Sequence, residues 1–270
     1  MTGASAETVA AHRWHRAQDY EALTGELQSR NAELVASLHP APAGVRSAYE
    51  IGCGTGALTG ALVRALPAAT IEAVDVSADM LAAAQLKTWP ERVCFRHAAF
   101  PESAPRVAYD AVFSNAALHW TYPRYVETFG AIRTLLRPGG LLCAAMAGRT
   151  RATDEFEETV REAIRGVTAQ QAPDDFTRRR IDVDAAEQLA ARANLAVEDA
   201  FVVERRVAVD ADVYARWWIA SGGPWQAHQV RPAEAVALVT DALGGPERRL
   251  SLVHASVLMR LRRDEDRAHA

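Results

Sequence analysis

"AYEIGCGTGALTGAL", residues 48–62, carries glycine at alternate positions, Gly52, Gly54 and Gly56, between a short apolar run and a helical pattern. A strand that ends in glycine and leads into a helix exposes unpaired backbone N–H groups, and the missing Cβ atoms let a ligand approach closely. The stretch also satisfies the loose dinucleotide fingerprint, and Asp75 follows about twenty residues later, where a ribose-binding acid belongs. It therefore predicts a nucleotide-cofactor site, with NAD as one candidate.

Short β-rich runs alternate with helical runs outward from this loop. We expect strands at 47–51, 70–75, 93–98, 109–115 and 141–147, helices at 55–66, 78–87 and 122–136, and a turn at "RPGG", 137–140. Strands that alternate with helices predict a parallel sheet with helices on both faces. Residues 45–148 are thus the expected cofactor-binding core of a Rossmann-like α/β fold.

The flanking segments complete one predicted domain over residues 1–270. Residues 7–38 read as two helices, and residues 1–40 are expected to cover the core. After Gly148 we expect helices at 153–165, 185–193 and 232–243, a further helix that carries Trp217 and Trp218, and strands at 199–210 and 250–261. These strands bring the sheet to seven, mostly parallel, and residues 149–198 and 210–248 are expected to form a helical cap on the acceptor side.

Composition narrows the function classes. The chain has 270 residues, of which 49% are hydrophobic, so it can bury a full core. Its net charge is −4 and it lacks a basic stripe, which argues against nucleic acid as a partner. We interpret two basic clusters, Arg178–Arg180 and the group Arg260, Arg262 and Arg263, as solvated surface rather than a substrate or nucleic-acid contact.

The cysteines and the apolar runs indicate the cellular setting. Cys53, Cys94 and Cys143 are isolated and lack metal-like spacing to histidine, so we predict neither a disulfide framework nor a metal site. No run approaches about 18 apolar residues, and the start of the chain does not resemble a signal peptide. We therefore expect a cytoplasmic protein without a membrane partner.

Glu50 and Asp75 bear on which nucleotide cofactor is bound. Glu50 stands two residues before Gly52, where a carboxylate would repel a pyrophosphate but favour an ammonium or sulfonium group. Asp75 ends its expected strand and can hold both hydroxyls of a ribose. Val76 and Met80 follow it and offer an apolar wall for an adenine.

Four stretches together resemble the successive motifs of class I S-adenosylmethionine-dependent methyltransferases: "YEIGCGTGALT", "IEAVDVSADML", "YDAVFSNAALHW" and "LLRPGGLLCAA". The resemblance covers roughly residues 45–148. The stretches "RWHRAQDYEALTGELQSRNAELVASL" and "SNAALHW" are similar, more narrowly, to malonyl-acyl-carrier-protein O-methyltransferases and trans-aconitate methyltransferases, which methylate a free carboxylate. The resemblance implies methyl transfer from S-adenosylmethionine to an oxygen of a small molecule, free or carrier-bound, with S-adenosylhomocysteine as product. We expect a monomer or a homodimer.

The resemblance also implies roles for single residues. Asp75 would take the ribose hydroxyls, and Glu50 would orient the cofactor's amino group. Other positions implied at the cofactor are Tyr20, Gly52, Cys53, Gly54, Gly56, Val76, Met80, Asn115 and Ala116. One position departs from the pattern, because Ala98 stands where the family has an acid for the adenine amino group. We expect backbone groups of Ala99 or Phe100 to replace it.

The acceptor should arrive at His119 and Trp120, which follow the fourth strand. A carboxylate acceptor is already anionic and needs no base, whereas a hydroxyl or an acidic carbon does. His119 can therefore be a base, a donor that orients a carboxylate, or a structural residue. Further candidates for the acceptor pocket are Tyr20, Trp217, Trp218 and Trp225, and "SGGPWQAHQ", 221–229, reads as a lid or a connecting loop.

Alternatives remain open from the sequence. They are methyl transfer to carbon or nitrogen, an S-adenosylmethionine-binding cyclase without methyl transfer, an NAD(P)-binding oxidoreductase, and a partner protein without catalysis. His97 and His254 lie in expected strands, and we interpret both as structural.

Overall fold

A computed structural model of the protein describes residues 17–165, 175–220 and 232–264. A single sheet runs through it with the strand order β3-β2-β1-β4-β5-β7-β6. The strands are β1 (Ser47–Ile51), β2 (Thr70–Asp75), β3 (Val93–His97), β4 (Tyr109–Asn115), β5 (Leu136–Ala147), β6 (Leu195–Asp210) and β7 (Arg249–Arg263). Strands β1 to β5 are parallel, and β7 runs antiparallel to both of its neighbours, β5 and β6. The predicted seven-stranded, mostly parallel sheet is confirmed.

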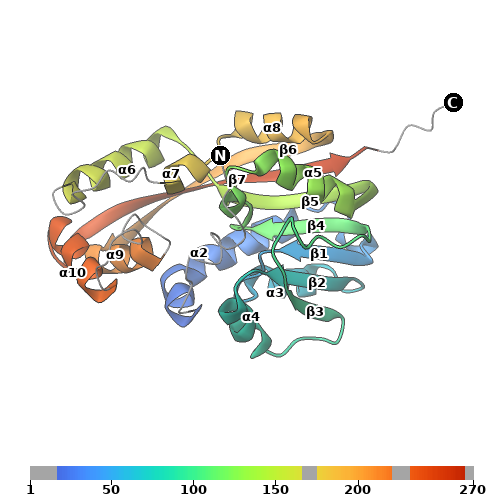
Figure 1. Ribbon diagram of the computed structural model, residues 1–270, viewed down its shortest axis with the longest axis horizontal. Helices are drawn as coiled ribbons and strands as arrows, with labels where there is room; N and C mark the ends of the chain where they lie inside the picture. Colours follow the sequence, from blue (N-terminus) through green and yellow to red (C-terminus); the bar gives the residue numbers. More distant parts are fainter. Residues whose placement is uncertain (1–16, 166–174, 221–231, 265–270) are drawn as a thin grey trace.

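Helices cover both faces of this sheet (Figure 1). They are α2 (Ala17–Ser37), α3 (Ala57–Ala65), α4 (Ala78–Gln85), α5 (Tyr125–Leu135), α6 (Arg151–Ile164), α7 (Asp175–Arg179), α8 (Val183–Arg192), α9 (Ala211–Ala220) and α10 (Pro232–Ala242), with short 3₁₀ turns at Pro42–Gly44 and Leu118–Thr121. Of the two helices expected over 7–38, the described residues contain α2, and residues 1–16 lie outside them.

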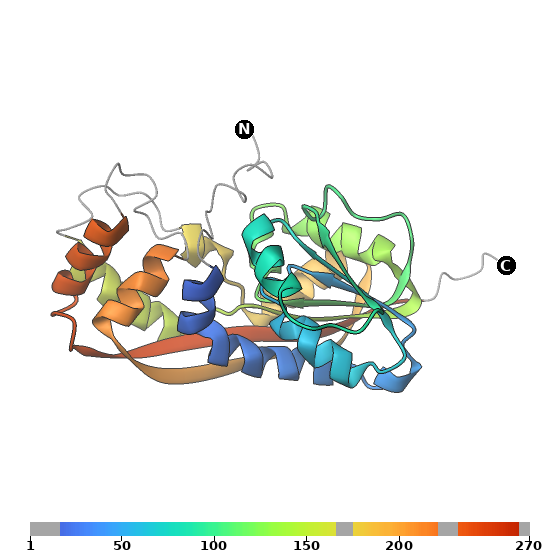
Figure 2. The same cartoon turned by 90° about the horizontal axis from the view of Figure 1, so that it is seen from below.

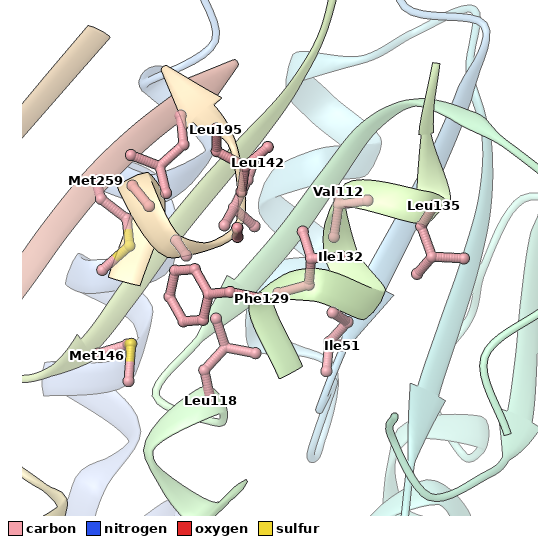
Figure 3. Packing of buried hydrophobic residues seen from close by; sticks show 14 of the residues in the cluster. Ile51, Val112, Leu118, Phe129, Ile132, Leu135, Leu142, Met146, Leu195 and Met259 are labelled. Carbon is pink, nitrogen blue, oxygen red and sulfur yellow. The ribbon is translucent and has the colours of Figure 1, made fainter. Parts of the chain in front are cut away.

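The pleat of the central strands divides the core into two layers. Tyr49, Val112 and Leu142 belong to the layer under α5 and α8, whereas their chain neighbours Ala48 and Phe113 belong to the layer under α2 and α3. Successive side chains of a strand point to opposite faces, and both faces are covered, so β1 and β4 are buried at nearly every position. Figure 3 shows the first layer, in which Phe129 and Ile132 of α5 lie among side chains from the strands.

The turn predicted at "RPGG" is wrong. Helix α5 leads directly into β5, and residues 137–140 belong to that strand as an irregularity in its pairing with β4. Tyr109 pairs with Leu136 and Ala111 with Leu141, so β5 carries extra residues opposite Asp110. Gly139 has a positive φ of 77°, and a Cβ at Gly140 would lie 3.0 Å from the Asp110 carbonyl oxygen. The glycines therefore serve a bulge inside the strand.

Strands β6 and β7 extend well beyond the rest of the sheet. They pair from Leu195 with Arg263 to Asp210 with Arg249, whereas β5 reaches no further along β7 than Ser256. The remaining two-stranded ribbon projects past the carboxyl ends of the parallel strands. Helices α6, α9 and α10 gather along it, as Figures 1 and 2 show, and share an apolar core that includes Val160, Tyr214 and Val239. We call these helices and the ribbon the lobe.

Candidate active site

A cavity opens at the carboxyl ends of β1, β2 and β4, beside α2 and in front of the turn that follows β4. This edge of a parallel sheet is where ligands bind in open α/β folds. Ten of the predicted cofactor-binding residues line it: Gly52, Cys53, Gly54, Asp75, Val76, Met80, Ala99, Phe100, Asn115 and Ala116. Trp120 lines it as well, and so do Thr24, Gly25, Gln28 and Ser29 of α2.

The three glycines of the loop have three different reasons to be glycine, and all have positive φ. A Cβ at Gly52 would overlap the Cβ of Ala117, and a Cβ at Gly56 would lie 2.8 Å from the Trp89 ring. A Cβ at Gly54 would meet no described atom within 4 Å, and Gly54 lines the cavity. Gly54 is thus the position at which the bare backbone faces the space for a ligand, while Gly56, which is not part of the lining, accommodates Trp89.

Asp75 and the loop hold each other in place. The Asp75 carboxylate accepts the Gly54 N–H at 2.7 Å on one oxygen and the Ser77 N–H at 2.8 Å on the other. Each carboxylate oxygen can accept further hydrogen bonds. Burial raises the pKa of Asp75, while the hydrogen bonds from Ser77 and Gly54 act against that rise. This wall of the cavity fits a ligand that brings hydroxyl donors, such as a ribose.

Glu50 is not part of the cavity lining. It is fully buried, and its carboxyl accepts the Thr59 hydroxyl at 2.6 Å. Burial raises the pKa of Glu50 to about 8, so the group is mainly protonated at neutral pH. Its Oε1 has no hydrogen-bond partner among the described residues. Any effect of Glu50 on a ligand is therefore indirect.

The end of β4 is tied to α2. The Asn115 side-chain amide donates to the Gln28 backbone carbonyl at 3.1 Å and to the Gln28 side-chain oxygen at 3.2 Å. The next residue, Ala116, has a φ of 55°, which is unusual for a residue with a Cβ. Such strained positions cluster at functional sites. Here the strained residue lines the cavity at the position where the resemblance implies the transferred methyl group.

Ala98, which stands where the family has an acid for the adenine amino group, lies in the wall of the first cavity. Ala98 is 8% exposed and lines the cavity together with Ala99 and Phe100. Glu102, which the sequence analysis did not single out, also lines it, but its carboxylate is paired with Arg124.

His119 lies in the 3₁₀ turn after β4 and does not line this cavity. It is 4% exposed, and its Nδ1 accepts the Ala147 N–H at 3.3 Å, which places the proton of the neutral ring on Nε2. Burial and the charges of Arg179 and Arg180 lower the pKa of His119 to about 3. The imidazole is therefore neutral at physiological pH.

His119 instead lines a second, smaller cavity between the sheet and the lobe. The two cavities have Gln28, Ala116 and Trp120 in common. The rest of the second lining is Ala145, Met146 and Ala147 of β5, Arg180, Trp217 of α9, and Leu252, Val253, His254, Ala255 and Ser256 of β7.

The other predicted acceptor residues lie elsewhere or outside the described part. Trp218 packs against the apolar core of the lobe. Trp225 and the segment 221–229 lie outside the described residues, and the side chain of Tyr20, a residue of α2, is also outside them.

The structure corrects our interpretation of Arg178–Arg180 as solvated surface. Arg178 is exposed, but Arg179 is 8% exposed and the Arg180 side chain is 11% exposed. The Arg179 guanidinium lies 4.7 Å from the centre of the Trp120 ring, and Arg180 lines the second cavity. The cause is a short bridge, in which the Ile181 N–H donates to the Ala147 carbonyl at 3.1 Å and draws this segment against the end of β5.

Comparison with known proteins identifies the core. Residues 49–142 match the family model described as a methyltransferase domain. This segment is similar to a methyltransferase domain. It includes most of β1, all of β2 to β4, the glycine loop and Asp75, which confirms the resemblance of the motifs.

Curated relatives match over part of their length. A trans-aconitate 2-methyltransferase of Acidovorax ebreus is 32% identical over 162 residues, which cover 60% of this chain and 58% of the relative. A malonyl-[acyl-carrier protein] O-methyltransferase of Halalkalibacterium halodurans is 33% identical over 108 residues, 38% of this chain and 40% of the relative. The matches thus span roughly half of these relatives.

Solved structures share the fold over most of the chain. A proposed methyltransferase of Bacillus halodurans superimposes with a TM-score of 0.61 at 14% identity, covering 87% of this chain and 99% of that one. A proposed sarcosine dimethylglycine methyltransferase of Galdieria sulphuraria gives 0.54 at 16% identity, covering 87% and 86%. Within the described residues, no helix is long and apolar enough to span a membrane, and no cluster of three or more metal-type ligands occurs.

Proposed function

We propose that the protein transfers a methyl group from S-adenosylmethionine to a carboxylate oxygen of a small molecule. The observation that carries this proposal is the joint position of the glycine loop and Asp75 in one cavity wall of a methyltransferase domain. The names of the relatives support an oxygen as the acceptor atom, because one is a trans-aconitate 2-methyltransferase and another a malonyl-[acyl-carrier protein] O-methyltransferase.

Residues that line this cavity are our proposed partners for each part of the cofactor. Asp75 accepts from the ribose hydroxyls, Val76 and Met80 flank the adenine, and the backbone of Ala99 or Phe100 meets the adenine edge. The methionine part lies against the loop 52–56 and the end of β4, with Asn115 and Ala116 nearest the methyl group. The role of Tyr20 at the methionine part stays a prediction, because its side chain lies outside the described residues, and Glu50 acts through the loop.

S-adenosylmethionine, when bound, supplies an electrophilic methyl group, so the protein's task is to position the acceptor and exclude water. A carboxylate acceptor needs no base. The low pKa of His119 keeps its imidazole neutral, which disfavours a base that works near neutrality, and its ring lines the second cavity rather than the first. Trp120 and Trp217 form apolar walls on the acceptor side, where the segments 149–198 and 210–248 act as the cap.

The sheet topology argues against the oxidoreductase alternative. Dinucleotide-binding folds place their strands in the order 3-2-1-4-5-6. Here the antiparallel strand β7 lies between β5 and β6, and the second cavity is built partly from it.

Mass spectrometry of ligand retained through purification tests the cofactor. We expect S-adenosylmethionine or S-adenosylhomocysteine; retained NADP would refute the proposal. Calorimetric titration with S-adenosylhomocysteine should then show that Asp75→Ala weakens binding by roughly 1–3 kcal/mol, the range for a charged hydrogen-bond acceptor. Asp79→Ala is the matched control, because Asp79 is an exposed acid in the first turn of α4. Equal affinities of the two variants would place the ribose elsewhere.

A further inference from the structure

The second cavity is basic. Among the described residues that line it, the ionisable side chains are His119, Arg180 and His254, and none is acidic. Arg205 lies opposite His254 on the neighbouring strand β6 and donates a hydrogen bond to Asn31 of α2. The Asn31 amide in turn donates at 2.9 Å to Ser256, a residue of the lining. Arg180 and the two histidines thus meet in one small space, with Arg205 on the strand beside His254.

The two histidines report the electrostatic state of this space. Burial, together with the charges of Arg180 and Arg205, lowers the pKa of His254 to about 4. The buried Nδ1 of His254 has no hydrogen-bond partner among the described residues. A buried polar atom without a hydrogen-bond partner is costly. An anionic group bound here would accept a hydrogen bond from Nδ1–H and would offset the positive charges that lower the histidine pKa.

Arg180 is held in place by an ion pair inside the protein. Its guanidinium pairs with the carboxylate of Glu157 in α6, and both side chains are about one-tenth exposed. Glu157 also accepts the Thr177 hydroxyl at 3.0 Å, which fixes the carboxylate. The planar guanidinium has five N–H donors and can bind a second carboxylate while it keeps the first.

We propose that the second cavity binds an anionic group of the acceptor, a carboxylate held by Arg180 with Glu157 as its positioning residue. This inference rests on the proposed function, under which the reacting oxygen lies in the first cavity beside Ala116. The second cavity meets the first at Gln28, Ala116 and Trp120. The anionic group is therefore distinct from the oxygen that is methylated, and the acceptor carries at least two acidic groups.

Binding of simple carboxylates to the protein saturated with S-adenosylhomocysteine tests the inference by calorimetry. The probes are the polycarboxylates succinate, glutarate and trans-aconitate and the monocarboxylates butyrate and crotonate. We expect at least one polycarboxylate to bind about 10- to 100-fold more tightly than the monocarboxylates, the size of a charge-assisted hydrogen bond. Arg180→Gln should abolish that preference, and Arg178→Gln, a change of an exposed neighbour, should keep it.

Further variants keep the test decisive. Because Arg180→Gln leaves Glu157 buried without this ion pair, the double variant Glu157→Gln/Arg180→Gln removes both charges and should show the same loss of preference with less effect on folding. Glu157→Gln alone keeps the guanidinium, so we expect a smaller loss of affinity and, with a turned-over acceptor, a raised KM at unchanged kcat.

Two results would overturn the inference: the parent shows no preference for polycarboxylates, or both variants that lack Arg180 still show it. S-adenosylhomocysteine affinity, measured in the same samples, separates the two proposals. Failure of the parent to bind S-adenosylhomocysteine removes the proposed function, whereas equal cofactor binding without the polycarboxylate preference removes the anion subsite alone.

Discussion

His119 is the residue whose substitution distinguishes the acceptor classes. Its pKa of about 3 leaves the ring neutral, with Nδ1 engaged by the Ala147 N–H. We expect His119→Gln, which keeps a donor, to retain much of the rate, and the parent's rate to show no histidine-like limb near pH 6–7 because a carboxylate acceptor is ionised above about pH 5. A pH–rate profile of both proteins measures this.

The opposite result has an equally clear meaning. A loss of about 10²–10⁴-fold in His119→Gln, together with disappearance of a limb near neutrality, would make His119 a general base. The acceptor would then be a hydroxyl or an acidic carbon.

The same histidine makes stability depend on pH. The folded pKa, about 3, lies below the value of about 6.5 expected for the unfolded chain, so the unfolded chain binds the proton first as the pH falls. Stability from this group is therefore fully present above pH 6.5 and is lost progressively toward pH 3. Urea unfolding at pH 7.5 and pH 5 should show His119→Gln losing less stability than the parent, by on the order of 1–2 kcal/mol. An identical pH dependence of the two proteins would mean that the His119 ring binds a proton as readily in the folded protein as in the unfolded chain.

At the scale of the element, substitutions at two glycines of the loop should distinguish an effect on folding from an effect on cofactor binding. Gly52→Ala places a Cβ against Ala117, whereas Gly54→Ala places one in the cavity. Both adopt positive φ, which costs alanine about 1–2 kcal/mol. We expect Gly52→Ala to lower the free energy of unfolding by clearly more than Gly54→Ala, and Gly54→Ala to weaken S-adenosylhomocysteine binding in a protein that still folds.

Gly130 is the matched control for both variants. It lies in α5, and a Cβ there meets no described atom within 4 Å. Gly130→Ala should keep cofactor affinity and gain roughly 0.5–1 kcal/mol of stability, since alanine favours a helix interior. Unchanged affinity in Gly54→Ala would contradict the assignment of the loop as the cofactor's cradle.

The elements also show what local pattern can and cannot predict. Strands β1, β2 and β4 have the predicted bounds, because each is a short β-rich run closed by glycine or a polar residue. The "RPGG" bulge escaped prediction because the same residues suit a turn, and only the pairing of Leu136 with Tyr109 and of Leu141 with Ala111 on β4 makes them part of a strand. Strands β6 and β7 are predicted at 199–210 and 250–261, which already includes nearly all of the ribbon that projects beyond β5. The residues missed are 195–198 at the start of β6 and 249, 262 and 263 at the ends of β7.

At the scale of the whole molecule, cofactor binding should stabilise the fold. A ligand that binds the folded state alone adds about 2.7 kcal/mol at one hundred times its Kd. We expect S-adenosylhomocysteine at that excess to raise the Tm of the parent by several degrees, and the same concentration to raise that of Asp75→Ala by less. Differential scanning calorimetry measures both. A rise with NADP and none with S-adenosylhomocysteine would count against the proposed cofactor.

How well each part of the site could be predicted depends on how far apart its residues lie in the chain. The cofactor wall follows from motifs that each occupy a few consecutive residues, so ten predicted residues meet in one cavity. The second cavity joins the end of β5 to Arg180 and His254, which lie far along the chain and carry no motif. Arg180 looked like surface because its burial depends on Ile181 pairing with Ala147, a contact that only the assembled sheet creates.

The place of β7 in the sheet has a consequence for synthesis of the protein. The ribosome makes this strand after the rest of the sheet, yet it lies between β5 and β6 and pairs with both. Until residues 249–263 leave the exit tunnel, β5 presents an open edge and β6 lacks its partner. Open edges invite pairing with other chains. A nascent or prematurely terminated chain is thus the form most exposed to aggregation, and its demand for chaperones should end when the last strand is inserted.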